Sequence, residues 1–282
     1  MKVLILGGTG MLGHKLWQVL SGRLDTFVTI RGSLLPLPSH HLLPEARTLE
    51  NIAAEDLESV GRALDQVQPH VVVNCIGIVK QRTAGKEPLP SIAINAYFPH
   101  RLAALCRARG SRLIHISTDC VFSGMKGNYT EDDTPDPVDL YGRTKLLGEL
   151  NQSHCLTVRT SMIGRELGSA YGLVEWFLRQ EGKTVSGYQN ALFSGLTTQA
   201  LAAILLRVIE DHPRLHGLWH IASTPISKYD LLGLIRSIHR LNVVLQPDAA
   251  IRCDRSLDGS RFQQATGITP PGWIPMIEEM AA

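Results

Sequence analysis

The sequence predicts an α/β protein in which a doubly wound parallel sheet carries a smaller C-terminal α/β part. Short apolar or β-branched runs alternate with longer stretches of helical period, a pattern typical of βαβ units in a mostly parallel sheet. The chain has 282 residues, of which 44% are hydrophobic, and such a length suits about two domains, or one doubly wound domain with a large appendage. We expect residues 1–160 to form the sheet domain and residues 161–282 to form mainly the smaller part, with segments exchanged between them.

Short apolar runs are predicted to form the strands of this sheet. The run 70–75 is apolar continuously rather than alternately, which indicates a strand buried on both faces. The other runs share its short length and its content of apolar and β-branched residues. The predicted strands are 3–6, 27–30, 70–75, 113–117, 155–160 and 218–221.

Helices are predicted between and after these strands. In the first of them, Leu12, Leu16 and Leu20 fall on one face at helical spacing. The helices predicted to alternate with strands are 10–20, 57–67, 92–109 and 141–150, and those predicted for the C-terminal part are 172–180, 196–211, 228–240, 260–266 and 274–280.

Composition and charge exclude several classes of protein. Lys and Arg number 28 against 26 Asp and Glu, and no stretch concentrates the positive charge, so we expect no nucleic-acid partner. The five cysteines are odd in number and form no C-x-x-C pair, which favours a reducing compartment over a disulfide framework or a zinc site. No apolar run approaches the roughly 20 residues of a membrane span. The sequence therefore predicts a cytoplasmic protein without a membrane partner.

A glycine-rich loop follows the first predicted strand and opens the first helix. One glycine permits the tight turn, the next lets the backbone approach a pyrophosphate, and the third allows close packing of helix and strand. The N-terminus of the helix then offers free N–H groups to the anion. This context predicts a dinucleotide site in a Rossmann-like fold, with cofactor contacts from Gly7, Thr9, Gly10, Met11, Leu12 and Gly13.

The end of the second strand bears on the choice of cofactor. An acidic residue there would bind the ribose 2′-hydroxyl of NAD, but the sequence reads Ile30-Arg31-Gly32-Ser33. A guanidinium suits a 2′-phosphate better, because it forms charge-assisted hydrogen bonds to phosphate. We therefore expect NADP(H) in preference to NAD(H), which stays possible. The alternative is that Arg31 is simply a solvated loop residue.

A tyrosine and a lysine stand four residues apart in a predicted helix. Tyr141 and Lys145 fall on one face, about one turn apart. A phenol with a pKa near 10 is a poor acid at neutral pH unless a nearby cation stabilises its phenolate, and Lys145 offers that cation. A hydroxyl from Ser117 or Thr118 ends the strand 113–117, at the edge where open α/β sheets place their chemistry.

These segments resemble a known family. The stretches that carry the resemblance are Ser117-Thr118-Asp119-Cys120-Val121-Phe122-Ser123-Gly124 and Tyr141-Gly142-Arg143-Thr144-Lys145-Leu146-Leu147-Gly148-Glu149. They are similar to those of extended short-chain dehydrogenase/reductases and, among these, of the dTDP-4-dehydrorhamnose reductase family. The resemblance covers nearly the whole chain, including Asn74-Cys75-Ile76-Gly77, Asn95 and Arg159-Thr160-Ser161.

The resemblance implies a role for each matching residue. Tyr141 would donate a proton to a carbonyl oxygen, while Lys145 would lower the pKa of Tyr141 and hold the nicotinamide ribose. Thr118 would hydrogen-bond the same oxygen, and Asn95 would lie in the proton path or only brace its helix. Further cofactor contacts are implied for Asn74, Cys75, Ile76, Gly77, Arg159 and Ser161, and Tyr141 is expected to contact the cofactor as well.

The residue after Asp119 separates related reactions. Sugar-nucleotide dehydratases carry an Asp-Glu pair there, because eliminating water needs its own acid and base, whereas this chain has Asp119-Cys120. The reductase family typically has a tyrosine at the position of Cys120. A cysteine there resembles epimerase-reductases, in which a thiol and a histidine exchange protons. The alternative is that Cys120 is a small apolar wall of the substrate pocket.

Residues for the substrate are expected outside the sheet domain and in its loops. Thr197 precedes a predicted helix, where a hydroxyl either caps the helix or meets sugar and phosphate oxygens. Arg252 and Arg255 either hold a diphosphate or are solvated. The predicted substrate-binding residues are Lys80, Cys120, Thr197, Arg252 and Arg255.

The resemblance thus implies an enzyme that reduces the 4-keto group of a nucleotide-linked 6-deoxy-4-hexulose with NADPH, for polysaccharide synthesis. A nucleotide-diphosphate sugar is the expected partner, and a homodimer is expected because family members commonly pair through helices. An alternative is a cofactor-binding regulatory subunit without turnover, since the beta subunit of methionine adenosyltransferase resembles the same family. No metal ligand is assigned.

Overall fold

A parallel sheet forms the centre of the molecule. The computed structural model describes residues 1–35, 42–80, 83–168 and 170–282. Within these residues, seven strands pair in the order β11-β6-β5-β4-β1-β2-β3, all of them parallel. This is the doubly wound, Rossmann-like arrangement that the sequence predicts. The strands are β1 (Lys2–Leu6), β2 (Asp25–Thr29), β3 (Thr48–Leu49), β4 (Val71–Asn74), β5 (Arg112–Ile116), β6 (Cys155–Arg159) and β11 (Gly217–His220).

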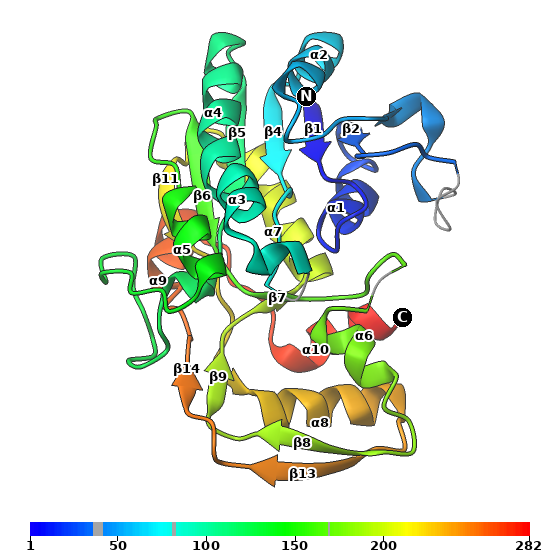
Figure 1. Ribbon diagram of the computed structural model, residues 1–282, viewed down its shortest axis with the longest axis vertical. Coiled ribbons are helices and arrows are strands. Elements are labelled where there is room, and N and C mark those ends of the chain that lie inside the picture. Colours follow the sequence, from blue (N-terminus) through cyan, green and yellow to red (C-terminus); the bar gives the residue numbers. More distant parts are fainter. Residues whose placement is uncertain (36–41, 81–82, 169) are drawn as a thin grey trace.

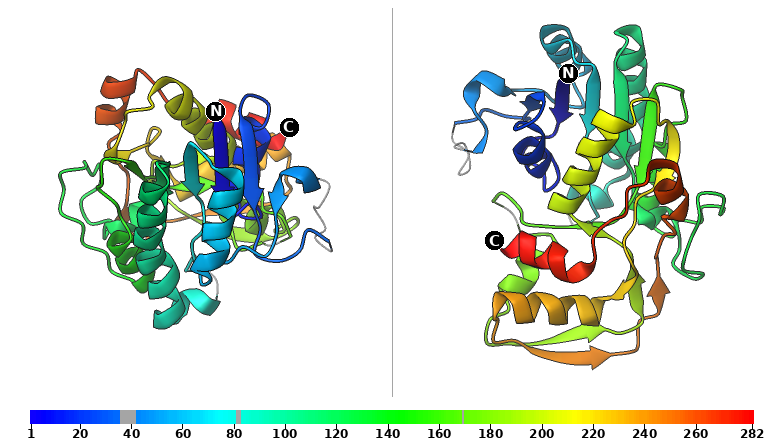
Figure 2. Two further views of the ribbon diagram at one scale, coloured as in Figure 1. Left: turned by 90° about the horizontal axis from the view of Figure 1, so that it is seen from above. Right: turned by 180° about the vertical axis from the view of Figure 1, so that it is seen from behind.

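Helices cover both faces of this sheet (Figures 1 and 2). Side chains of a strand point alternately to the two faces, so Val3 and Ile5 of β1 join one core cluster while Leu4 and Leu6 join the other. The first cluster packs under α1 (Gly13–Leu20) and α7 (Thr198–Asp211), and the second under α2 (Leu57–Val67) and α4 (Phe98–Ala108).

The C-terminal part lies beyond the carboxyl ends of the strands, at the lower end of Figure 1. There β8 (Thr184–Tyr188) pairs in parallel with β13 (Val244–Asp248), and α8 (Lys228–His239) packs against both. The remaining elements of this part are α6 (Leu173–Leu178), β9 (Ala191–Phe193), β12 (Ile226–Ser227), β14 (Cys253–Asp254) and α10 (Trp273–Ala281). In contrast, α9 (Ser260–Thr266) packs against β11 at the edge of the central sheet.

The helix predicted over 92–109 is interrupted. The structure has α3 (Pro88–Ser91), a π-helical turn η4 (Ile92–Tyr97) and then α4. Pro99 explains the break, because proline has no N–H to donate to the carbonyl four residues earlier and its ring crowds that carbonyl. The carbonyl concerned belongs to Asn95, and it faces α5 (Leu140–Leu147) instead, 2.0 Å from where a Cβ on Gly148 would lie.

Segments beyond residue 160 take part in the sheet region. β11 adds to the sheet edge beside β6, and α7 packs against α1. The helix predicted to begin at Leu196 begins at Thr198, because Leu196–Thr197 forms β10, paired with β7 (Met162–Ile163). Among the described residues, no helix combines the length and the apolar character needed to cross a membrane.

Candidate active site

The glycine loop after β1 forms a tight backbone cradle. Gly7 has a positive φ of 88°, and its carbonyl accepts a hydrogen bond from Gly10 N at 3.0 Å. A Cβ on Gly13 would lie 2.1 Å from the Gly7 oxygen, so only glycine lets α1 begin this close to the loop. No side chain caps the N-terminus of α1, and its first turn holds no acidic residue. The free N–H groups there suit a pyrophosphate.

The loop after β4 closes beside this cradle. Asn74 is buried, its Oδ1 accepts a hydrogen bond from Ile76 N at 3.1 Å, and its amide contacts His115 Nδ1 at 3.1 Å. Ile76 lies against Gly7, since a Cβ on Gly7 would be 3.2 Å from Ile76 Cγ1. Asn74 therefore shapes the turn through Cys75, Ile76 and Gly77. Burial raises the pKa of Cys75 to about 12, so its thiol stays protonated.

Arg31 lies at the end of β2, as predicted, with most of its side chain exposed. Its Nη2 contacts Glu55 Oε1 at 2.8 Å, and Ser33 Oγ donates to Glu50 Oε2 at 3.0 Å. An exposed ion pair of this kind is weak.

Thr118 and Tyr141 meet where β5 ends and α5 begins. Thr118 is buried, caps the short turn η5 (Asp119–Val121) by accepting a hydrogen bond from Cys120 N, and donates to Asp119 Oδ1 at 3.2 Å. Asp139 caps α5 by accepting from Gly142 N at 2.7 Å. This places Tyr141 in the first turn of α5, where its side chain hydrogen-bonds to Thr118.

Lys145 follows Tyr141 by one turn and is buried. Its Nζ donates to the carbonyl of Ile116 at 2.6 Å, which fixes α5 to the end of β5. Burial lowers the pKa of Lys145 to about 8, and Glu149 and Cys75 oppose that shift.

The pKa of Tyr141 differs from expectation. Burial raises it above its usual range, the nearby Cys120 adds to the rise, and the hydrogen bond to Thr118 opposes it. The lowering predicted from Lys145 is therefore not seen. The physical reason is that desolvation of the phenolate outweighs the stabilising contacts around it. Tyr141 is accordingly a protonated phenol at neutral pH, the form that donates a proton.

Asn95 lies in the π-helical turn, and its buried amide is fully used. Its Oδ1 accepts from Ile78 N and its Nδ2 donates to Ile78 O, both at 2.9 Å, while Thr144 Oγ1 lies 3.4 Å from Nδ2. Asn95 thus ties the loop after β4 to the face of α5 between Tyr141 and Lys145. These contacts support the bracing alternative.

Cys120 lies beside Tyr141 but is a poor base. Burial raises the pKa of Cys120 to about 12, Asp119 raises it further, and Lys80 and Arg255 oppose the rise. A thiol with such a pKa is almost entirely protonated at neutral pH. This favours the interpretation of Cys120 as part of the wall of the pocket.

Arg159 forms a buried ion pair instead of facing the glycine loop. Its Nε and Nη2 each donate to Glu149 at 2.8 Å, and Glu149 also accepts from Ser117 Oγ at 2.7 Å. The guanidinium is 3% exposed, and its free donors point to His220 Nε2 at 3.5 Å. The structure therefore favours a structural role for Arg159 over the predicted cofactor contact. Ser161, two residues on, uses its carbonyl to accept from Leu196 N.

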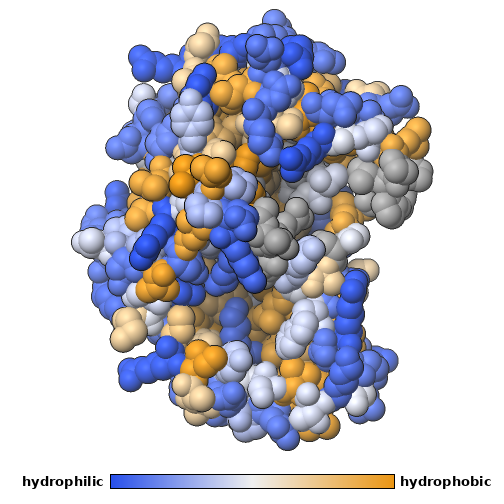
Figure 3. All heavy atoms as spheres, in the orientation of Figure 1, coloured by the Kyte–Doolittle hydropathy of each residue, from blue (hydrophilic) through white to orange (hydrophobic). Residues whose placement is uncertain are grey.

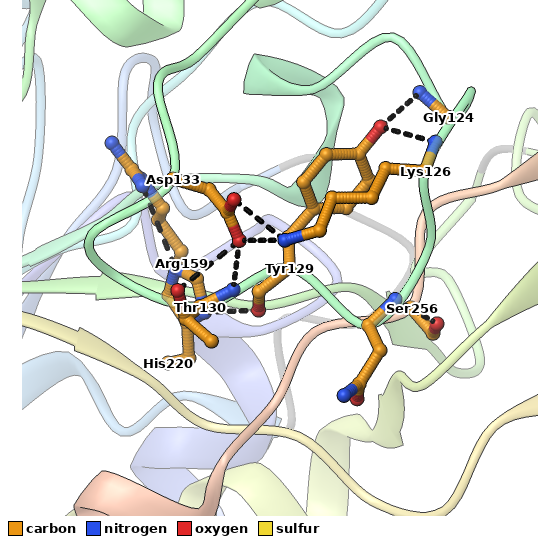
Figure 4. Close-up of polar contacts among 9 residues, drawn as sticks. Gly124, Lys126, Tyr129, Thr130, Asp133, Arg159, His220 and Ser256 are labelled. Atoms are coloured by element: carbon orange, nitrogen blue, oxygen red, sulfur yellow. Dashed lines mark hydrogen bonds and ion pairs between the residues drawn. The ribbon is translucent and has the colours of Figure 1, made fainter.

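Tyr129 fastens the C-terminal segment next to this ion pair (Figure 4). Its hydroxyl accepts hydrogen bonds from Gly124 N and Lys126 N at 3.2 and 3.0 Å. Its backbone N donates to Ser256 O at 2.9 Å, and its carbonyl accepts from His220 Nδ1 at 3.1 Å. The loop that follows η5 is thereby joined to the segment that carries Arg255.

The predicted substrate residues divide into two groups. Arg255 is partly buried and its Nε donates to Phe122 O at 2.9 Å, while Lys80 Nζ lies 3.9 Å from Asp139 Oδ2, so both lie at the site. Thr197 is fully buried and caps α7 by accepting from Ala200 N, and Arg252 is exposed. Capping accounts for the hydroxyl of Thr197, and Arg252 lies exposed in the loop before β14.

Two residues near the site escaped the sequence analysis. Glu149 stands four residues after Lys145, and that helical spacing was the available signal. Lys228 begins α8, far along the chain, and local sequence carries no sign that it folds back to Asp119 and Cys120. Within the described part of the chain, no group of three or more His, Cys, Asp and Glu side chains is placed to hold a metal ion.

Comparisons with known proteins find relatives over the whole chain. The family model described as the RmlD substrate binding domain matches residues 1–282. The chain is 27% identical to a protein of Shigella flexneri named dTDP-4-dehydrorhamnose reductase, over 99% of this chain and 97% of that one. It is 32% identical to methionine adenosyltransferase 2 subunit beta of Rattus norvegicus, over 52% of this chain and 41% of that one.

A solved structure shares the fold. The dTDP-4-dehydrorhamnose reductase of Bacillus anthracis, crystallised in complex with NADP, is similar to this chain with a TM-score of 0.82 and 23% identity. The similarity covers 99% of this chain and 98% of that one.

Proposed function

This chain belongs to the RmlD substrate binding domain family, and from that premise we propose that it is an NADPH-dependent reductase. The substrate is the 4-keto group of a nucleotide-linked 6-deoxy-4-hexulose, and the physiological role is polysaccharide synthesis. In this proposal residues 1–160 hold the cofactor and residues 161–282 mainly hold the substrate.

One observation carries the proposal. The side chains of Thr118 and Tyr141 lie beside each other where β5 ends and α5 begins, with the buried Lys145 one turn further along α5. Two hydroxyl donors converging on one point suit a carbonyl oxygen that gains negative charge during reduction.

The residues of the chain then divide the work. Tyr141 donates its proton to the carbonyl oxygen, and Thr118 donates a second hydrogen bond to it. Lys145, held by the Ile116 carbonyl, holds the nicotinamide ribose. Asn95 keeps the loop after β4 against α5 and acts as a positioning residue.

The dinucleotide fits the observed cradle. Gly7, Gly10 and Gly13 leave the space that side chains would fill, and α1 offers uncapped N–H groups to the pyrophosphate. Thr9, Met11 and Leu12 complete the loop, and Arg31 is placed for a 2′-phosphate. When bound, the cofactor supplies the hydride.

The test is consumption of NADPH and NADH by the purified protein with dTDP-4-dehydro-6-deoxy-L-mannose and with the UDP- and GDP-linked 4-keto sugars. Oxidation of the cofactor with one of them supports the reductase and names the nucleotide. If none of the three sugars led to oxidation of the cofactor by a protein that binds NADP(H), the proposed reductase function would be overturned.

A regulatory subunit without turnover is the second candidate. The observation that favours it is the 32% identity to methionine adenosyltransferase 2 subunit beta over about half of this chain. The two candidates differ in one experiment: co-purification with a synthetase, combined with no reduction of any keto sugar, would favour the regulatory function.

An epimerase-reductase using Cys120 is a weaker alternative. Such chemistry needs a thiolate, and the pKa of Cys120, raised to about 12 by burial, opposes one.

We also propose a homodimer in the cytoplasm. Exposed hydrophobic side chains gather over α3 and α5 (Figure 3), and Leu89, Tyr97 and Leu147 are 82%, 54% and 64% exposed. Apolar side chains clustered in this way favour a protein contact, and the free cysteines support a reducing compartment. Light scattering gives the oligomeric state, and a monomer at micromolar concentration would contradict the pairing.

A further inference from the structure

Lys228 is a cation without a carboxylate partner. It is the first residue of α8, whose N-cap Ser227 accepts a hydrogen bond from Asp230 N at 3.0 Å. Its Nζ lies 3.6 Å from the centroid of the Phe193 ring. Within the described residues, no carboxylate oxygen lies within the 4 Å of an ion pair from this ammonium. Phe193 thus holds the ammonium in place without neutralising it.

Three segments bring cations to the same place. Lys228 comes from α8, Arg255 from the segment after β14, and Lys80 from the loop after β4. Arg255 is fixed by its hydrogen bond to the carbonyl of Phe122, two residues after Cys120. Burial lowers the pKa of Lys228, and the neighbouring Asp119 and Cys120 oppose the shift, whereas Lys80 adds to it. The sheet order β12-β9-β14 places Lys228, which follows β12, and Arg255, which follows β14, on the two sides of β9.

The local charges do not balance. Asp119 accepts from Thr118, and Asp139 caps α5 and faces Lys80 at 3.9 Å. Asp254, the residue before Arg255, accepts from the backbone N and the hydroxyl of Ser256. Arg255, like Lys228, has no ion-pair partner within the described ranges. Holding two unpaired cations in a partly buried place costs free energy. An anionic ligand would remove that cost.

We propose that Lys228, together with Arg255, binds the diphosphate of the nucleotide-linked substrate. This inference rests on the proposed function, because it assigns the charged end of the same substrate. A diphosphate supplies the negative oxygens that both cations lack, and a guanidinium beside an ammonium matches two adjacent phosphates. Sugar hydroxyls are neutral and would leave the charges unbalanced.

The position of Lys228 also lets it contribute to the choice of substrate. Its neighbours Asp119 and Cys120 directly follow Thr118, so a phosphate bound by Lys228 sets the distance from the diphosphate to the reacting carbonyl. Lys228 is therefore a substrate-binding residue and not a catalytic one.

The test compares Lys228→Met with Lys228→Arg and with Lys183→Met, a matched control on an exposed lysine. Binding of dTDP, UDP and GDP to the NADP-loaded protein is measured by calorimetry, independently of turnover. Loss of one charge-assisted hydrogen bond predicts a Kd at least about tenfold higher in K228M. K228R and K183M are expected to bind within about threefold of the wild type, because the charge at the site is kept.

The outcomes separate the two proposals. If the wild type binds a nucleoside diphosphate and K228M does not, the inference holds even when no keto sugar is reduced. With an active reductase, K228M should raise KM for the sugar nucleotide with little change in kcat, as lost uniform binding does. Equal Kd values for K228M and the wild type, or no binding of any of the three diphosphates by the wild type, would overturn the inference.

Discussion

The ammonium of Lys145 donates a hydrogen bond to the carbonyl of Ile116 at 2.6 Å. Ile116 is the last residue of β5, and Thr118 stands two residues further on. One hydrogen bond thus couples the helix that carries Tyr141 to the strand that leads into Thr118.

Tyr141→Phe is expected to reduce turnover by about 10²- to 10⁴-fold, the usual contribution of a positioned general acid. Cofactor binding should be unchanged, because the phenol contacts the reacting carbonyl. NADPH oxidation measures the first quantity and NADPH fluorescence the second. Tyr97→Phe, on an exposed tyrosine, is the matched control. A Y141F enzyme that kept most of its turnover would remove Tyr141 from the role of acid.

Activity is expected to fall as the pH rises through the pKa of Lys145. Burial lowers that pKa to about 8, so the ammonium is charged below pH 8 and becomes neutral above it. The pKa of Tyr141 lies above its usual range, hence the tyrosine keeps its proton over the same interval. A profile of kcat/KM from pH 6 to 10 measures this decrease in activity. Glu149 raises the pKa of Lys145, so Glu149→Gln should lower the pH at which activity falls. If that pH were unchanged in the variant, the decrease could not be assigned to Lys145.

Glu149→Gln is expected to destabilise the fold by about 3 kcal/mol, because breaking a buried ion pair leaves an uncompensated charge. The charge left behind is that of Arg159, whose side chain is 3% exposed. Urea unfolding gives the free energy. Asp211→Asn removes an acid from the exposed Arg207 pair at 3.9 Å and should cost less than about 1 kcal/mol. Equal losses of unfolding free energy in the two variants would show that the buried ion pair contributes no more to stability than the exposed one.

Arg31→Gln is expected to raise KM for NADPH about tenfold while leaving KM for NADH nearly unchanged, because a hydrogen bond to a charged group is lost with the first cofactor alone. Initial rates measured with each cofactor give the ratio of KM for NADPH to KM for NADH. Arg62→Gln serves as the control, since Arg62 is an exposed arginine of α2 paired with Asp56. A parallel change for both cofactors would mean that Arg31 does not meet the 2′-phosphate.

Cys120→Ala is expected to keep turnover within about tenfold of the wild type, since a side chain of the pocket wall contributes packing and no proton transfer. Reaction in deuterium oxide should place no deuterium at C3 or C5 of the product. Deuterium there in the wild type, and its loss in C120A, would instead identify an epimerase-reductase.

Local patterns were sufficient for the sheet and for the centre of the site. β1, β4, β5 and β6 are short apolar runs between glycines and polar residues, and such runs are legible without knowledge of the fold. The glycine loop and the spacing of Tyr141 and Lys145 are legible for the same reason, because each lies within a few consecutive residues.

The pairing of strands far apart in the chain could not be predicted from local sequence patterns. β8 and β13 pair across about sixty residues, and neither strand shows a strong apolar run; β13 even contains Pro247. The π-helical turn before Pro99 does not follow from the local apolar pattern. It depends on the hydrogen bond that Pro99, without an N–H, cannot give to the Asn95 carbonyl. Arg159 looked like a cofactor ligand by its motif, but its partner Glu149 depends on how α5 lies against β6.

The edge strand β11 bears on how the chain folds during synthesis. Residues 217–220 reach β6 only after the whole stretch 160–216 has left the ribosome, and until then β6 presents an unpaired edge, a hazard for aggregation. His220 N also donates to Glu131 at 2.8 Å, so the late strand seals the loop as well as the sheet. We expect an N-terminal fragment ending near residue 160 to associate with itself, and the native protein to unfold as one cooperative unit rather than in two stages.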